Sequence, residues 1–331
     1  MRKRLAAQPI RVTVATALVG AATMFGACTS PSVRPNLEPT PQSTLPIDSG
    51  GLQAAPAVTD LAGRFAYGAA DGHIWTIDMA TGVRTQVTHG GGGADFDPHW
   101  SPRGSMLVFR TERFRPPDPT STGYNGIFVV NADGSGEHPV NPRGGGLFPE
   151  WSPEDLIVFS SPRPDRSEGL FSVRPDGSGL RDLEIYAEHV TWSPDGTETL
   201  VDRNDTVGSG QDWNIWRATD TFTGLTRLTS TAGDDHFGGW SPDASTIAFS
   251  TSRTDEGDVW LMHRDGTDQA PLVTGPGAQS AEAWLPDGRI LIADYRTTEP
   301  AWYLIDPNRS NIRSVPQLAG LQGPVDWITA R

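Results

Sequence analysis

The sequence offers few residues that could form disulfide bonds or bind nucleic acid. Cys28 is the only cysteine among 331 residues, so no disulfide bond within the chain can stabilise the fold. Lys3 is the only lysine, and every basic residue after Cys28 is arginine. Four of the 26 basic residues and none of the 40 acidic residues precede Cys28, which leaves a net formal charge of −18 after it. We expect such an acidic domain to bind neither nucleic acid nor anionic lipid headgroups.

A single long apolar run is present, and it lies near the N-terminus after four basic residues. Val12–Ala27 has 16 residues, which is short for a membrane-spanning helix but sufficient for the hydrophobic region of an export signal. The run ends in Phe25-Gly26-Ala27-Cys28, which resembles the lipobox of bacterial lipoproteins. The resemblance implies that residues 1–28 are a signal peptide and that diacylglycerol on Cys28 anchors the protein to the extracytoplasmic face of the cell membrane. The alternative is an ordinary cleaved signal with an incidental cysteine.

The next segment differs in composition from the rest of the chain. Residues 29–57 are rich in Pro, Ser, Thr and Gly and contain almost no large apolar side chains. Such a segment cannot bury enough surface to order itself. We therefore expect residues 29–57 to be a disordered tether and residues 58–331 to be the folded domain.

Six tryptophans divide the folded domain into units of similar length. The units begin at Trp100, Trp151, Trp192, Trp240, Trp284 and Trp327. Their spacings are 51, 41, 48, 44 and 43 residues, and the first five tryptophans are each followed by Ser-Pro or Leu-Pro. A period in the forties with several short strands per unit is typical of a β-propeller.

Each unit has the pattern of four strands. Ser193-Pro194-Asp195-Gly196 fits a type I turn after the tryptophan strand, and Asp-Gly pairs mark hairpins further along the units. The chain before Trp100 provides three strands, beginning at Arg64, and the chain after Leu321 provides one tryptophan strand, Val325–Thr329. Together, the three N-terminal strands and the C-terminal tryptophan strand make one four-stranded blade. The sequence therefore predicts an all-β, six-bladed propeller of four-stranded blades, closed by its C-terminal strand.

The repeat resembles that of the TolB-like propeller family, also described as WD40-like. Pro98-His99-Trp100-Ser101-Pro102 and Pro149-Glu150-Trp151-Ser152-Pro153 match the start of that family's unit, and the resemblance covers residues 63–331. It implies a fold and not an activity, because propellers carry many functions. No Gly-x-Ser-x-Gly nucleophile elbow is present, so the catalytic half of the peptidases that share this propeller is missing.

An arginine recurs near the end of the second strand in five units. These residues are Arg113, Arg163, Arg203, Arg253 and Arg296, and their spacing predicts that they share one level on one face. A ring of this kind could bind carboxylates or phosphates. The alternative is that each arginine forms an ion pair within its own blade, with an acid such as Asp165, Asp205 or Asp255.

Histidines and acids gather just before the tryptophan strands. The candidates are His99, His189, Asp235 and His236, which inter-blade loops could bring together at one rim of the channel. His and carboxylate ligands suit a transition metal, and oligogalacturonide lyases, which share this propeller type, hold a histidine-bound metal in such a place. No His-x-His or His-x3-His pair occurs here, so neither a metal site nor any other cofactor is predicted.

Two functional hypotheses follow. The first is a monomeric, membrane-anchored, extracytoplasmic propeller without catalytic residues, which binds an envelope protein or peptide segment through one rim. The second is an enzyme or sugar-acid-binding protein, similar to a polysaccharide lyase, that uses the channel mouth.

Overall fold

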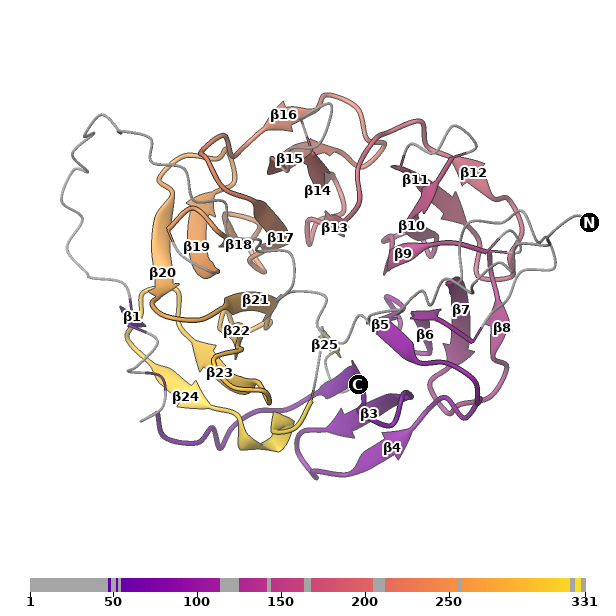
Figure 1. Ribbon diagram of the computed structural model, residues 1–331, viewed down its shortest axis with the longest axis horizontal. Helices are drawn as coiled ribbons and strands as arrows, with labels where there is room; N and C mark the ends of the chain where they lie inside the picture. Colours follow the sequence, from indigo (N-terminus) through magenta and orange to yellow (C-terminus); the bar gives the residue numbers. More distant parts are fainter. Residues whose placement is uncertain are drawn as a thin grey trace, which may run out of the picture.

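The computed structural model describes residues 47–48, 52, 55–113, 125–141, 144–163, 168–204, 212–254, 257–321 and 325–328. These residues form six blades arranged in a ring, each with four antiparallel strands (Figure 1). The predicted all-β, six-bladed propeller is therefore confirmed. The predicted signal peptide and Cys28 lie outside the described residues.

The strands of each blade run in order from the central channel to the outer edge. Blade 1 consists of β25 (Val325–Ile328), β2 (Arg64–Gly68), β3 (Ile74–Asp78) and β4 (Arg84–Gln86). Blade 2 consists of β5 (Asp95–Trp100), β6 (Met106–Thr111), β7 (Gly126–Asn131) and β8 (His138–Pro139). Blade 3 consists of β9 (Leu147–Trp151), β10 (Ile157–Pro162), β11 (Glu168–Val173) and β12 (Arg181–Asp182).

The other three blades follow the same plan. Blade 4 consists of β13 (Val190–Trp192), β14 (Glu198–Asn204), β15 (Trp213–Thr219) and β16 (Thr226–Arg227). Blade 5 consists of β17 (Asp235–Trp240), β18 (Thr246–Thr251), β19 (Asp258–His263) and β20 (Ala270–Thr274). Blade 6 consists of β21 (Gln279–Trp284), β22 (Ile290–Asp294), β23 (Ala301–Ile305) and β24 (Ile312–Ser314), followed by a short 3-10 helix, Pro316–Leu318.

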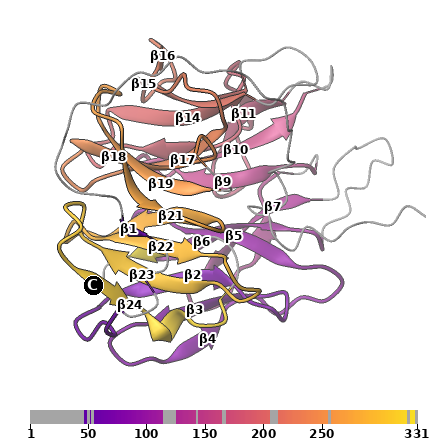
Figure 2. The ribbon, with the colours of Figure 1, turned by 60° about the vertical axis from the view of Figure 1, so that its left-hand side comes forward.

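The two ends of the domain close the ring as the repeat predicts. β25 pairs antiparallel with β2, with Trp327 opposite Phe65, and so supplies the innermost strand of blade 1. Blade 6 packs against this closing blade in a shared apolar cluster, and Figure 2 shows the two blades side by side. No blade of the ring is therefore left without its inner strand.

The tryptophans of the repeat join neighbouring blades. Trp151 of blade 3 packs on Val108 and Val129 of blade 2, and its indole N–H donates to the carbonyl of His99 at 3.1 Å. Trp284 of blade 6 likewise donates to the carbonyl of Gly239 in blade 5 at 3.0 Å. These side chains therefore fill the gaps between blades.

The serine after the tryptophan holds the turn that follows. The hydroxyl of Ser193 accepts the backbone N–H of Glu198 at 3.0 Å and donates to the Asp195 carboxylate at 2.6 Å. Ser241 makes the same two contacts, with Thr246 and Asp243. The repeated Ser-Pro-Asp sequence thus fixes the start of the second strand.

Part of the segment predicted to be a tether packs on the propeller. β1 (Ile47–Asp48) pairs in parallel with β20 at the outer edge of blade 5. Leu52 is fully buried in a cluster formed by side chains of blades 5 and 6, and Ala57 bridges to Ser314. The composition of residues 29–57 did not indicate these contacts; the rest of the predicted tether lies outside the described residues. Within the described part of the chain, no helix is long and apolar enough to cross a membrane.

Candidate binding pocket at the channel mouth

The innermost strands of several blades carry a β-bulge at the same place. In β5, β9, β17 and β21 the register shifts by one residue shortly before the tryptophan. Asp97, Phe148 and Phe237, each three residues before its tryptophan, have φ of 51°, 49° and 55°. A side chain at positive φ costs on the order of 1 kcal/mol or more, and such residues concentrate at functional sites. The bulges therefore mark the channel lining as a candidate site.

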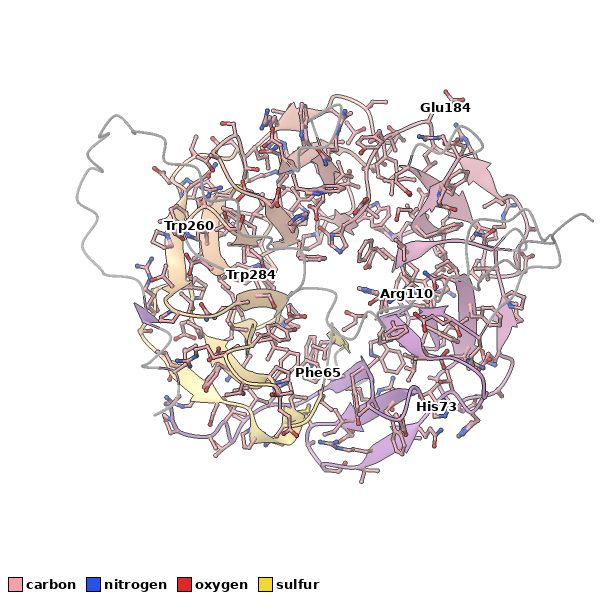
Figure 3. All side chains as sticks on the ribbon, viewed as in Figure 1. Phe65, His73, Arg110, Glu184, Trp260 and Trp284 are labelled. Atoms are coloured by element: carbon pink, nitrogen blue, oxygen red, sulfur yellow. The ribbon has the colours of Figure 1, made fainter. Side chains whose placement is uncertain are left out.

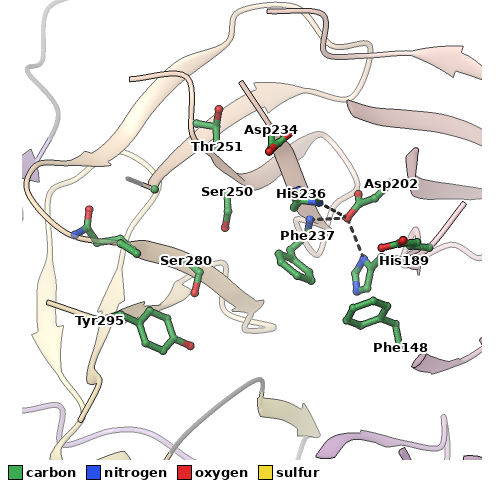
Figure 4. A pocket seen from close by; sticks show the side chains of 14 residues that line it. Phe148, His189, Asp202, Asp234, His236, Phe237, Ser250, Thr251, Ser280 and Tyr295 are labelled. Atoms are coloured by element: carbon green, nitrogen blue, oxygen red, sulfur yellow. Dashed lines mark hydrogen bonds and ion pairs between the residues drawn. The ribbon is translucent and has the colours of Figure 1, made fainter. Parts of the chain in front are cut away.

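A pocket that is open to solvent is lined by residues of blades 3, 4, 5 and 6 (Figure 4). Phe148 of β9 and Phe237 of β17 form part of its wall, with their ring centroids 6.3 Å apart and their planes at 70°. The His189 ring contacts both, at 6.0 and 5.2 Å between centroids. Tyr295, which follows β22, lines the pocket as well. The wall is thus built of rings from separate blades.

Asp202 of β14 organises the polar part of this pocket. Its carboxylate accepts the backbone N–H of Phe237 at 3.0 Å, which ties the bulge of β17 to blade 4. The same carboxylate lies 3.7 Å from Nδ1 of His236 and 3.9 Å from Nδ1 of His189. Asp202 therefore brings together two of the histidines that the sequence singled out.

The pKa values of the two histidines are shifted in opposite directions. Burial lowers the pKa of His189, with the Asp202 carboxylate opposing the effect. Burial also acts to lower the pKa of His236, but the Asp202 carboxylate outweighs it and the pKa is raised. His189 is consequently neutral at pH 7, whereas His236 holds its proton more firmly.

Glu188 is the unusual carboxylate of the pocket. It is partly buried and lines the cavity beside His189, and its side chain has no hydrogen bond or ion pair with any residue that the structure describes. Burial raises the pKa of Glu188 to about 7, and the charges of Glu168 and Asp202 act in the same direction. The carboxylate therefore changes its charge near neutral pH.

His99 lies in a separate cluster at the meeting of blades 1, 2 and 3. Its Nδ1 is 2.7 Å from the Glu150 carboxylate, and Asp326 of β25 accepts the backbone N–H of Trp100 at 2.6 Å. Burial acts to lower the pKa of His99, but Glu150 more than offsets it and raises this pKa to about 9. His99 is therefore a charged link between blades, and the sequence candidates His99, His189 and His236 do not form one site. Among the described residues, no group of three or more histidine, cysteine or acidic side chains is placed to hold a metal ion.

Four of the five recurring arginines are bound to acids within their own blades. Arg113 and Arg253 pair with Asp95 and Asp235 at 2.8 and 2.9 Å, and Arg163 pairs with Asp182 at 2.8 Å. Asp235, which the sequence placed at the rim, is thus the fully buried partner of Arg253. The Arg296 guanidinium pairs with Asp294. These acids differ from Asp165, Asp205 and Asp255, the partners considered from the sequence, which lie outside the described residues.

Arg203 does not share the level of the other four arginines. Arg113, Arg163, Arg253 and Arg296 each come six residues after the residue that pairs with the blade's tryptophan. In blade 4 Trp192 pairs with Thr199, so Arg203 comes only four residues later, inside β14. Its guanidinium lies 4.8 Å over the Trp216 ring. The expected ring of five arginines is therefore a set of four at one register position, and Arg203 lies two residues earlier along its strand.

Several residues of the pocket were not identified from the sequence. Phe148 and Phe237 both stand three residues before a repeat tryptophan, which is the signal that could have found them. Asp202 occupies the register held by Arg110, Ser160 and Ser250 in other blades. Figure 3 shows Arg110 near the centre of the ring, so this register faces the channel. An acid at a channel-facing register was thus a second usable signal.

Comparison with known proteins gives partial matches in sequence. No known family model matches the chain. An uncharacterized protein of Agrobacterium fabrum is 32% identical over 141 residues, which cover 38% of this chain and 45% of that protein. Tol-Pal system protein TolB of Anaeromyxobacter dehalogenans is 32% identical over 93 residues, which cover 28% of this chain and 20% of that protein. The chain thus spans less than half the length of each of these relatives.

Solved structures match over most of the chain. TolB from Acinetobacter baumannii superposes with a TM-score of 0.63 at 13% identity, covering 82% of this chain and 68% of that one. A putative TolB from Agrobacterium tumefaciens gives a TM-score of 0.59 at 17% identity, covering 82% of this chain and all of the other. At these identities the likeness concerns the fold.

Proposed function

We propose that this chain, which folds as a TolB-like β-propeller, is a non-catalytic binding module of the bacterial cell envelope. Its partner is a protein or peptide segment, held at the channel mouth between blades 3 and 6. The observation that carries the proposal is the pair Phe148 and Phe237, which β-bulges present at positive φ to an open pocket. Partly exposed aromatic side chains in a concave site are the usual anchors of protein recognition.

The closed ring suits this role. The six blades pack on one another through the repeat tryptophans, so the bulges rest on a rigid frame. Binding residues on a preorganised scaffold lose little conformational freedom on association. The relatives named TolB carry the name of the Tol-Pal system, and a role of that kind for this chain belongs to the proposal because the match covers 20% of such a relative.

We further propose that acylated Cys28 anchors the module to the outer face of the cell membrane. Between Cys28 and β1, which pairs with the edge of blade 5, lie residues 29–46. Fully extended, a segment of that length reaches about 60 Å. The domain would then stay close to the membrane with blade 5 nearest the point of attachment. An acidic domain adds no electrostatic attraction to anionic lipids, so the acyl chains supply the binding.

One experiment tests both parts of the proposal. The wild-type protein, Cys28→Ser and the double variant Phe148→Ala/Phe237→Ala are expressed in the native cell, fractionated and captured from solubilised envelopes. We expect the wild type to be in the membrane fraction with a stoichiometric partner, Cys28→Ser to leave that fraction, and the double variant to lose most of the partner. Phe222→Ala is the matched control, since Phe222 also has positive φ, 60°, and contacts another ring, that of Trp192, but is not among the residues that line the pocket.

Two results would overturn the proposal. Membrane retention of Cys28→Ser equal to the wild type would remove the lipid anchor. Undiminished recovery of the partner by the double variant would remove the channel mouth as the binding site.

A further inference from the structure

The pocket at the channel mouth combines aromatic rings with more acids than bases. Glu188, Asp202 and Asp234 line it, and none of the described residues that line it is an arginine or a lysine. Asp234 accepts the backbone N–H of Trp213 at 3.1 Å, and Asp202 shares its charge with His236. Glu188 has no such partner within the described part of the chain. A carboxylate that has no hydrogen bond or ion pair, and is attracted only at longer range by His236, favours a cationic ligand in a partly buried pocket.

Extending the proposed function, we propose that the pocket recognises the guanidinium or ammonium group of a basic side chain on the bound segment. Both groups are cations that donate hydrogen bonds and accept none.

The hydrogen-bonding capacity of the pocket matches such a group. Gln279 of β21 is 1% exposed and lines the pocket. Its amide nitrogen donates to the carbonyl of Gly277 at 2.8 Å, whereas its Oε1 has no hydrogen-bond partner among the described residues. The carboxylate of Glu188 is likewise an acceptor without a hydrogen bond to any residue that the structure describes. A ligand that only donates can pair with the Glu188 carboxylate, whereas Gln279 Oε1 is closed off within the pocket wall.

The rings supply the second element of recognition. Phe148, Phe237 and Tyr295 line the pocket, and Figure 4 shows the two phenylalanines on the wall opposite Tyr295. The Tyr295 hydroxyl donates to Glu282 at 3.3 Å, which places another acidic side chain at the hydroxyl end of this ring. A cation close to aromatic faces is attracted by their quadrupoles, and arginine also stacks on them. The rings and the acids therefore favour the same ligand.

The same geometry gives the recognition a pH dependence. The titratable neighbours of Glu188 are Glu168, Asp202, His189 and His236. The pKa of Glu188 is raised to about 7 by burial and by the charges of Glu168 and Asp202, whereas the charge of His236 acts to lower it. A cation binds the ionised carboxylate, so affinity rises as pH increases from 6 to 8 and Glu188 loses its proton.

The test uses the full-length protein in detergent and short blocked peptides. Calorimetric titrations compare acetyl-Gly-Arg-Gly-amide, its lysine analogue, the neutral citrulline analogue and free spermidine, at pH 6 and pH 8. We expect the arginine peptide to bind about tenfold more tightly than the citrulline peptide and to bind more tightly at pH 8. We expect Glu188→Gln to weaken binding about tenfold. The matched control is Glu184→Gln, four residues earlier, whose side chain is exposed at the outer edge of the ring (Figure 3).

The outcomes separate this inference from the proposed function. Equal binding of arginine and citrulline peptides, or unchanged binding by a Glu188→Gln protein that melts normally, would overturn it. Binding of spermidine without either basic peptide would also overturn it, by assigning the pocket to a free polyamine. If no cation binds but the Phe148→Ala/Phe237→Ala protein still loses its partner, the inference fails and the proposed function stands. If that variant keeps its partner as well, both fail.

Discussion

His99, His189 and His236 show how far the surroundings of one residue type can differ within one channel. The Glu150 carboxylate raises the pKa of His99 to about 9, whereas burial lowers the pKa of His189. The Asp202 carboxylate raises the pKa of His236. The sequence predicts that histidines and acids gather near the rim, because they recur just before the tryptophan strands. It cannot predict which acid each histidine meets, since that depends on how neighbouring blades are placed.

The raised pKa of His99 predicts that stability depends on pH through this residue. A group whose folded pKa lies above its unfolded value of 6.5 stabilises fully below pH 6.5, and the contribution is lost as pH rises through about 9. The shift corresponds to about 3 kcal/mol. We therefore expect the free energy of unfolding of the wild type to fall between pH 7 and pH 9.5, and that of His99→Gln to lose this part of the slope.

Urea denaturation at several pH values measures this effect. The control is His263→Gln, because His263 and its partner Asp268 are each 60% exposed and such a pair contributes little. The control should keep the wild-type slope between pH 7 and pH 9.5. A His99→Gln protein with the same slope would show that the contact with Glu150 does not stabilise the fold.

At the scale of strands, the repeat predicted most of what the structure contains. Period-two alternation and the Asp-Gly turns located the second and third strands, and the missing tryptophan strand before Trp100 predicted closure by β25. The bulges in β5, β9, β17 and β21 escaped prediction, because a bulge is a property of two paired strands and not of one. The same reason explains Arg203, whose level depends on the pairing of Trp192 with Thr199.

The N-terminal segment shows the limit of composition as a guide to order. Residues 29–57 are poor in apolar side chains as a whole, yet Leu52 is fully buried against blades 5 and 6 and β1 covers the edge of β20. An uncovered edge strand invites association with other chains. A few well-placed residues can therefore hold a segment whose average composition suggests disorder.

This packing predicts a large effect of one substitution in the N-terminal segment. Leu52→Ala removes a fully buried side chain from a cluster that includes Val259, Val273 and Ile292, which should lower the free energy of unfolding by about 2–4 kcal/mol. Val83→Ala, at a side chain that is 59% exposed, should change it by less than about 0.5 kcal/mol. Urea denaturation of both variants measures the difference. Equal stability of the two would mean that the segment does not contribute to the core.

At the scale of the whole molecule, closure of the ring supports the proposal that recognition takes place at the channel. Six blades joined through tryptophans leave the inner strands fixed, and the positive-φ residues Phe148 and Phe237 lie on those strands. The outer strands are short: β8, β12 and β16 have two residues each. The channel mouth therefore has both the pocket and the rigid support that a binding site needs.

The measurement that tests this account most directly is site-specific photo-cross-linking in the native cell. A benzophenone amino acid replaces either Phe237, at the channel mouth, or Val83, in the hairpin between β3 and β4 at the outer edge of blade 1. The account predicts a discrete protein adduct from position 237 and none from position 83. Adducts from position 83 with none from position 237 would contradict it, because recognition would then lie on the outer edge of the ring.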